Sequence, residues 1–422
     1  MDVIEATLAM VLNRILEPQS KRATHIWLQE VYEPRFSSIS LQHLYRSLDF
    51  LARYKEKIEE GLYLKVRNLF NLELDLVFYD TTSIHFEGNG PKKLAKKGYS
   101  KSKRPDLNQI LIGVLLTKEG LPIGHEIFPG NTYDGTTLKV ALDTLGRRFK
   151  IKRLIFVGDR DLLSEENLNY LKEQGYEYIL GVKMRNQREI REEIIYHPAP
   201  YEPITESLQA KEINLSGTRY LLCHNEEEAE RDRIVREEIL HNLKDKLKGG
   251  GLKRVLTPEA RRYLKLTQEG FALQEEKIEQ EALYDGRYLL QTSVQDLSLK
   301  EIVLSYKNLW LIEAAFRSLK NIFKIRPVFH WTEPRVRGHV FICFLSFLLT
   351  TTLQRKLKEL SLQENISEIL RDLRKFKAVR FTLKGEPYLV RTELQGLAHL
   401  AFQAVGLRPP VRVEKLNRDC KE

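Results

Sequence analysis

The spacing of apolar residues changes character near residue 74. Before it, apolar residues recur every three or four positions, as in Leu41, Leu44 and Leu48, which is typical of amphipathic helices. After it, they form short unbroken runs that predict buried strands, at residues 74–79, 110–116, 123–128, 154–157 and 178–182. The pattern therefore predicts a helical N-terminal region over residues 1–72, followed by an α/β domain.

Helices are predicted between the last three of these strands. Asp134 and Ser164 are each suited to begin one, because a short polar side chain can accept hydrogen bonds from the first backbone amides of a helix. Gly175 ends the second helix. Three successive strands, followed by strands that alternate with helices, indicate a mixed sheet with helices on its faces.

This regular alternation stops at residues 184–284. Residues 226–247 alternate between acids and bases, as on a solvated helix, and three glycines follow at 249–251. A further strand at 288–292 and a single helix over 298–323 are expected after this region. We therefore divide the chain into a helical N-terminal region at 1–72, a first part of the core at 73–183 and an insertion at 184–284. The second part of the core, with the single helix, follows at 285–360, and a C-terminal region at 361–422.

Composition excludes several classes of protein. With 42 % hydrophobic and 30 % charged residues, the chain is typical of a soluble globular protein. Its 3 cysteines lie far apart, which excludes a disulfide-stapled scaffold and indicates a reducing compartment. The longest apolar run, at 340–349, is shorter than the roughly 20 residues of a membrane span. We therefore expect a buried helix there, no membrane association and a cytoplasmic protein.

A basic segment precedes the second predicted strand. Residues 91–104 contain seven Lys or Arg residues and no acid, and the whole chain has a formal net charge of +10. Lys101, Lys103 and Arg104 are candidates for contacts with nucleic-acid phosphates, whose neutralisation makes binding salt-dependent. The alternative is a solvated loop.

Three carboxylates stand out by position. Asp80 and Asp159 each follow an apolar strand, and functional groups gather at such strand ends in open α/β sheets. Glu313 lies within the predicted helix 298–323, on a polar stripe that also carries Tyr306 and Lys320. Three such carboxylates could bind two Mg²⁺ ions and so activate the attacking oxygen of a phosphodiester exchange. The alternative for the two aspartates is that they only cap turns. The alternative for Glu313 is an ion pair with Arg317, four residues on.

Motifs around these acids occur in a characteristic order. Residues 78–83 read FYDTTS, residues 130–134 GNTYD and residues 158–164 GDRDLLS, before Glu313 and the segment RPVFH at 326–330. In this order they resemble the DDE transposases of bacterial insertion sequences. The resemblance implies a ribonuclease H-like core with an insertion between the fourth-strand Asp and the Glu helix. It also implies that Asp80, Asp159 and Glu313 form the catalytic, metal-binding triad, with Mg²⁺ as cofactor and Mn²⁺ able to substitute.

The resemblance extends to DNA contacts and assembly. One subgroup carries Tyr, Arg, Glu and Lys at fixed spacing, and Tyr306, Glu313 and Lys320 match it. Leu309 stands at the Arg position, so Arg317, one turn beyond Glu313, is the candidate phosphate contact in its place. Tyr306 and Lys320 are the other expected DNA contacts. Double-stranded DNA, as element ends and target, is the expected partner, with a homodimer on paired ends.

The predicted function is metal-dependent DNA strand cleavage and strand transfer of an insertion element. A catalytically silent DNA-binding protein derived from a transposase is the alternative, favoured by Leu309 and by a family match that begins close to Met1. The match implies a shortened end-recognition module. A hydrolase that uses two carboxylates is a third interpretation, which the positive charge disfavours.

Overall fold

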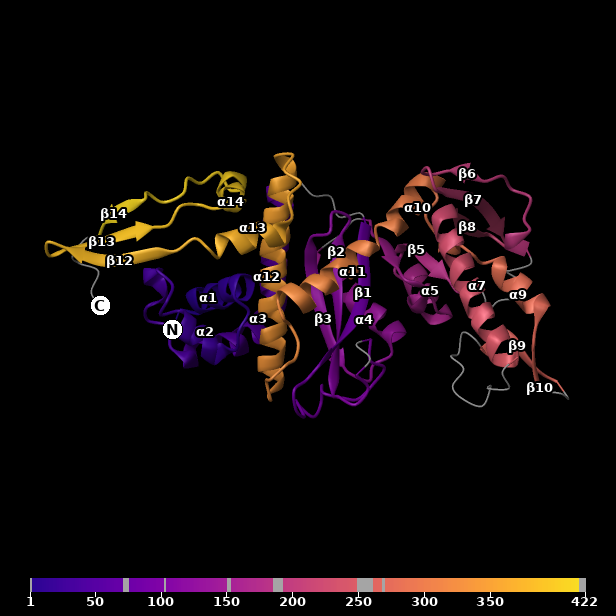
Figure 1. Ribbon diagram of the computed structural model, residues 1–422, viewed down its shortest axis with the longest axis horizontal. Helices are drawn as coiled ribbons and strands as arrows, with labels where there is room; N and C mark the ends of the chain where they lie inside the picture. The colour runs from indigo at the N-terminus through magenta and orange to yellow at the C-terminus, as the bar shows by residue number, and fades with distance from the viewer. Residues whose placement is uncertain are drawn as a thin grey trace. The chain divides into compact units, whose positions relative to one another are not determined.

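The computed structural model describes residues 2–70, 76–101, 104–149, 153–184, 193–248, 261–267 and 270–416. The chain forms two compact units. The first comprises Met1–Lys152 and Trp310–Glu422, and the second comprises Arg153–Leu309 (Figure 1).

Helices from both ends of the chain build the first part of unit 1. The helices α1 (Val3–Leu16), α3 (Leu41–Phe70) and α12 (Glu333–Glu359) pack on one another, and α2 (Lys21–Trp27) and the short η1 (Pro34–Phe36) complete the group (Figure 1). Leu44 and Leu48 of the predicted apolar stripe are fully buried. Asp2 and Ser20 cap α1 and α2 through their side chains, which satisfies the first backbone amides.

The most apolar helix, α12, is long and apolar enough to cross a membrane, yet 67 % of its most apolar window is buried inside the protein. It contacts α1, α3 and β3 within unit 1. The prediction of a buried core helix around residues 340–349 is confirmed.

An antiparallel sheet of β1 (Leu76–His85), β2 (Gln109–Thr117) and β3 (Pro122–Pro129) forms the second part of unit 1. Every residue of β2 is buried, as its unbroken apolar run predicts. The helix α4 (Asp134–Phe149) contacts β2 and β3, and α11 (Trp310–Arg317) contacts β1. A single π-helical turn, η4 (Ser318–Ile322), continues α11.

The C-terminal region adds α13 (Ile366–Leu373), α14 (Ala398–Ala404) and a small sheet to unit 1, drawn in yellow tones in Figure 1. Its strands β12 (Ala378–Leu383), β13 (Glu386–Arg391) and β14 (Val413–Lys415) are antiparallel neighbours in that order. The helices α13 and α14 contact each other and pack on α1 and α12 respectively.

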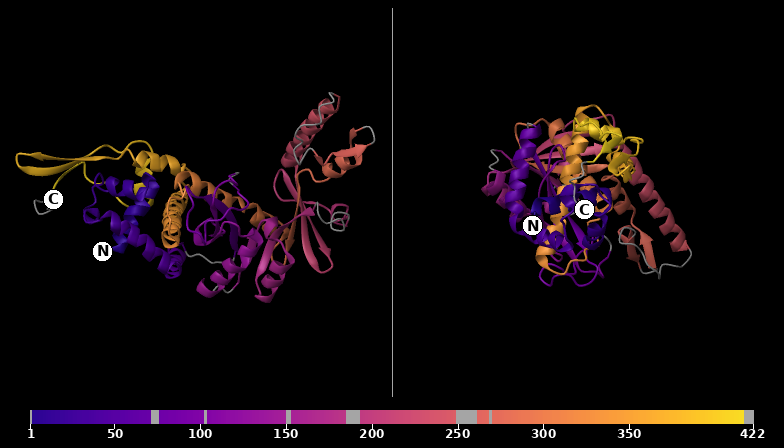
Figure 2. Two further views of the ribbon diagram at one scale, coloured as in Figure 1. Left: turned by 90° about the horizontal axis from the view of Figure 1, so that it is seen from below. Right: turned by 90° about the vertical axis from the view of Figure 1, so that its left-hand side faces the viewer.

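Unit 2 contains a mixed sheet. Its strands β4 (Ile155–Gly158) and β5 (Glu177–Val182) are parallel and are connected by the short η2 (Arg160–Leu162) and α5 (Glu165–Glu173). Antiparallel partners follow in the order β11 (Arg287–Thr292), β8 (Thr218–Asn225), β7 (Leu208–Leu215) and β6 (Glu202–Pro203). Further elements described in unit 2 are α7 (Glu226–Lys248), β9 (Leu264–Thr267), β10 (Gly270–Leu273), α9 (Glu275–Ala282) and α10 (Leu299–Lys307) (Figures 1 and 2).

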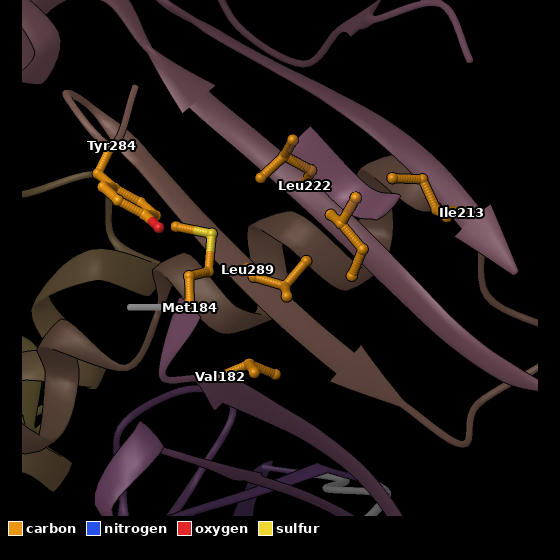
Figure 3. Packing of buried hydrophobic residues seen from close by; sticks show 7 residues of the cluster. Val182, Met184, Ile213, Leu222, Tyr284 and Leu289 are labelled. Carbon is orange, nitrogen blue, oxygen red and sulfur yellow. The ribbon is translucent and has the colours of Figure 1, made fainter. Parts of the chain in front are cut away.

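One hydrophobic cluster covers a face of this sheet (Figure 3). Leu289 of β11 stands directly opposite Val182 of β5 on one side and Leu222 of β8 on the other, so all three side chains share a face. Met184, just after β5, and Ile213 of β7 also belong to the cluster, as do Ile194 and Tyr284. The buried side chains on this face therefore link β7 and β8, from the region 184–284, to β5 and β11. Burial of one face stabilises the register in which these strands pair.

The predicted fold class is confirmed as a mixed α/β architecture with an N-terminal helical region. Along the chain, β1, β2, β3, α4, β4, α5 and β5 follow in the order expected of a ribonuclease H-like core. Two local predictions are wrong. Asp80 does not end its strand, because Thr81, Thr82 and Ser83 continue the pairing of β1 with β2. The helix predicted over residues 298–323 is broken after Lys307, where Asn308 ends α10 and a turn at Leu309 precedes α11.

Candidate active site

Asp80 lies in the middle of β1, opposite Val114 of β2, and its side chain is 28 % exposed. Its Oδ1 accepts a 2.6 Å hydrogen bond from the backbone N–H of Thr81. Strand residues alternate between the two faces of a sheet, so the side chains of Asp80, Thr82 and Ile84 point to the same face. The register of β1 therefore fixes where the carboxylate points.

Two lysines flank this carboxylate. The Lys101 ammonium is 3.6 Å from Asp80 Oδ1 and 2.9 Å from Asp134 Oδ2. The Lys320 ammonium donates to Thr82 Oγ1 at 2.5 Å. Burial, with the positive charges of Arg326 and Lys101, lowers the pKa of Lys320 to about 8. The Asp80 carboxylate therefore has positively charged neighbours, with the Lys101 ammonium nearest to it.

Glu313 and Arg317 are exposed on α11, the helix that contacts β1. Lys320 lies on the π-helical turn that continues α11, which is how it reaches Thr82. Unit 1 therefore brings the elements that carry Asp80, Glu313 and Lys320 into contact.

Asp159 directly follows the last residue of β4 in unit 2, as the sequence predicts. It caps η2, and its Oδ1 accepts a 2.7 Å hydrogen bond from the backbone N–H of Arg160. This contact has the same form as that of Asp80, whose own Oδ1 accepts from the next residue. In both cases the local backbone orients one carboxylate oxygen.

A pocket of about 370 Å³ opens beside Asp159 within unit 2. Arg160, Lys183 and Arg287 supply positive charge to its lining, and Lys183 pairs with Asp161 at 2.8 Å. Val182, Met184, Tyr284 and Leu289 line the pocket and also belong to the cluster of Figure 3. The pocket therefore combines aromatic and cationic groups next to a carboxylate.

Tyr306 of α10 lines the same pocket. Its ring stacks on Tyr288 of β11, with ring centroids 5.9 Å apart. Burial, and next the negative charge of Asp159, raises the pKa of Tyr306. A Cβ on Gly181 of β5 would lie 2.5 Å from the Tyr306 hydroxyl, so only glycine admits the ring in this position.

The break at Leu309 separates the predicted polar stripe into two parts. Tyr306 belongs to unit 2 with Asp159, whereas Glu313, Arg317 and Lys320 belong to unit 1 with Asp80. The seven-residue spacing of Tyr306 and Glu313 is therefore not the spacing of one continuous helix.

Some basic side chains of the segment before β2 form ion pairs within the protein. Lys101 contacts carboxylates of the chain itself, and the exposed Arg104 pairs with Asp106 at 2.8 Å. Lys103 lies outside the described residues. Sequence reasoning missed Asp134 as a partner of Lys101, although it follows the motif GNTY directly and was expected only to cap a helix.

The donor chemistry around Asp80 fits a hard cation. A lysine ammonium already lies among oxygens of Asp80, Thr81 and Asp134, and oxygen is the ligand type that Mg²⁺ prefers. Among the described residues, no group of three or more His, Cys, Asp or Glu side chains within a unit is placed to hold a metal ion. Asp80 and Glu313 in unit 1 and Asp159 in unit 2 are side chains of the type that binds Mg²⁺.

Comparison with known proteins gives the family. A model of the family described as "Transposase DDE domain" matches residues 72–349, about two thirds of the chain. The chain therefore belongs to the transposases with a DDE domain. Members of this family in general depend on divalent metal ions.

Similarity to solved structures is distant. A piggyBac transposase synaptic complex with hairpin DNA is 12 % identical with a TM-score of 0.44, over 88 % of this chain and 70 % of that one. A Mos1 transposase paired-end complex is 16 % identical with a TM-score of 0.18, over 42 % of this chain and 59 % of that one. No curated protein matches the chain.

Proposed function

We propose that this transposase cleaves and joins DNA strands at the ends of an insertion element, with Asp80, Asp159 and Glu313 as its catalytic, metal-binding carboxylates. The observation that carries the proposal is the contact of α11 with β1, which gathers Asp80, Lys320 and the helix of Glu313 in one unit. Asp159 is the partner acid from the other unit, held by its own backbone turn.

The carboxylates bind divalent cations in this proposal, with Mg²⁺ as the physiological ion and Mn²⁺ as a substitute. Such ions polarise the attacking oxygen and stabilise the leaving oxygen of a phosphodiester. The chain itself orients one oxygen of Asp80 and one of Asp159 through the Thr81 and Arg160 amides. This orientation precedes metal binding and lowers its entropic cost.

DNA is the proposed partner on several surfaces. Lys320 and Arg317 follow Glu313 and would neutralise phosphates near the reacting bond. Arg104, which is exposed, and Lys103 are further proposed phosphate contacts from the basic segment, together with Lys101, whose ammonium is 3.6 Å from Asp80 Oδ1. Tyr306 would contact DNA from the wall of the pocket beside Asp159. A homodimer on paired ends is the proposed assembly, since two ends must be joined in one reaction.

The test is cleavage of DNA that spans the ends of the element at the protein's own locus. Purified protein is incubated with Mg²⁺, with Mn²⁺ and with chelator, and Asp159→Asn and Glu313→Gln run beside wild type. Glu368→Gln, an exposed acid on α13, is the matched control for the loss of charge. Metal-dependent cuts at the element boundary, absent in both site variants and present in the control, are expected.

Other outcomes are equally informative. Near-normal cleavage by Glu313→Gln would remove Glu313 from the triad. A salt-sensitive gel shift without cutting would support the silent DNA-binding alternative, in which only the electrostatic contacts persist.

A further inference from the structure

The side chain of Lys101 is surrounded by oxygen atoms of unit 1. Its ammonium lies 2.8 Å from the Thr81 carbonyl oxygen, 3.2 Å from Thr81 Oγ1 and 2.9 Å from Asp134 Oδ2. Asp80 Oδ1 is more distant, at 3.6 Å. The ammonium therefore occupies a position between two carboxylates, closer to Asp134 than to Asp80.

This position is fixed from three directions. The backbone N–H of Lys101 donates a 3.0 Å hydrogen bond to Ser83 Oγ, which attaches the segment to β1. Thr81 is fixed by the pairing of β1 with β2, and Asp134 is the first residue of α4. The side chains of Lys101, Asp80 and Asp134 are only 28 %, 28 % and 20 % exposed, so water screens their charges less than on an open surface.

The positive charges near Asp80 oppose the binding of a divalent cation to it. Lys101 and Lys320 both lower the net negative charge that a divalent ion would meet, and an ammonium close to Asp80 Oδ1 repels such an ion. Binding of the ion is therefore favoured only if Lys101 moves farther from Asp80. Asp134 is placed to retain the ammonium when that happens, because it already makes the shorter contact.

We propose that Lys101 is a positioning residue that competes with the divalent cation for Asp80, and that Asp134 sets the affinity for the cation by holding Lys101 away. The proposal rests on the proposed role of Asp80 as a metal ligand. It assigns Asp134 a part in the site without making it a ligand.

The test is Mn²⁺ binding to the full chain without DNA, measured by electron paramagnetic resonance of free Mn²⁺. Lys101→Met removes the competitor and is expected to tighten binding by about tenfold. Asp134→Asn leaves Lys101 nearer to Asp80 and is expected to weaken binding by about tenfold. A merely structural role of either residue would not move the affinity in opposite directions.

A double variant separates this proposal from a direct role of Asp134. If Asp134 acts through Lys101, Asp134→Asn changes nothing once Lys101→Met is present. If Asp134 is itself a metal ligand, the double variant binds Mn²⁺ more weakly than Lys101→Met alone, and the proposal is wrong. Thermal unfolding of each variant shows that it is folded, and Lys101→Gln replaces Lys101→Met if that variant is not.

The proposed function and this inference fail in different ways. Asp80→Asn should abolish the site in an otherwise folded chain. If wild type shows no Mn²⁺ binding that depends on Asp80, the metal-binding role of Asp80 is wrong. If that binding is present but Lys101→Met leaves it unchanged or weakens it, only the competition between Lys101 and the cation is wrong.

Discussion

The ammonium of Lys320 donates a hydrogen bond to the hydroxyl of Thr82, two residues after Asp80 on β1, across 238 positions of the sequence. The contact fixes η4, the turn that continues the Glu313 helix, against the strand that carries Asp80, the first acid of the proposed triad. It also gives Lys320 a defined, half-buried place near Asp80.

Replacing this lysine should weaken DNA binding in a characteristic way. Lys320→Met removes one cation from the proposed phosphate contacts, so the slope of log affinity against log salt should become shallower by about 0.9. Fluorescence anisotropy with an element-end duplex at several NaCl concentrations measures this slope. Lys324→Met, an exposed lysine four residues on, is the control. An unchanged slope for Lys320→Met would exclude a phosphate contact by Lys320.

The close approach of Tyr306 to Gly181 predicts a coupled pair of variants. Gly181→Ala places a methyl group against the Tyr306 hydroxyl and should destabilise the chain by about 1–3 kcal/mol. Tyr306→Phe removes the oxygen, so Gly181→Ala should cost clearly less in the double variant than alone. Urea unfolding of the wild type, both single variants and the double variant measures the coupling. Simple additivity would show that the two residues do not meet as described.

Two glycines in the helical part of unit 1 should respond in opposite directions. Gly338 of α12 lies against the backbone of Leu48 in α3, where a Cβ would overlap the carbonyl group. Gly338→Ala should therefore destabilise by about 3 kcal/mol through forced separation of the helices. A Cβ on Gly61 of α3 would meet open space, and glycine is a poorer helix former than alanine. Gly61→Ala should therefore raise the free energy of unfolding by about 0.5–1 kcal/mol. Thermal unfolding checks both, and a harmless Gly338→Ala would refute the close packing of α3 and α12.

The buried Lys21 predicts a pH dependence of stability. Burial, followed by the positive charge of Arg14, lowers the pKa of Lys21 from 10.5 to about 7. Between these values the unfolded chain binds a proton that the folded chain has released, so the free energy of unfolding should rise with pH from about 7 to about 10. Below about pH 7 the folded chain must hold the Lys21 charge in a buried site, which lowers the free energy of unfolding. This destabilisation is relieved only as the pH rises above about 7.

Lys21→Met should therefore increase stability at pH 6–7 and flatten the rise towards pH 10. Urea unfolding at intervals between pH 6 and pH 10 measures both effects. The control is Arg22→Met, because Arg22 is exposed beside it and should leave the slope unchanged. An identical pH profile for Lys21→Met and wild type would contradict the shifted pKa.

The sequence by itself determined the kinds of element and their order. The strands at residues 110–116, 123–128 and 178–182 and the Ser164 cap all follow from local patterns, because periodicity and capping depend on residues a few positions apart. The candidate acids Asp80, Asp159 and Glu313 came from the same local patterns together with the order of the motifs.

Only the tertiary structure decided how these residues meet. Pairing with β2 carried β1 past Asp80, a turn at Leu309 divided the Glu313 helix from that of Tyr306, and Lys101 turned toward Asp134 instead of solvent. Each outcome depends on partners far away in the sequence, whose competition for hydrogen bonds, charge and buried space has no signature in a local window. The register of a strand and the ion-pair partner of a charged side chain are therefore properties of the folded chain, even where the sequence already shows which residue types are involved.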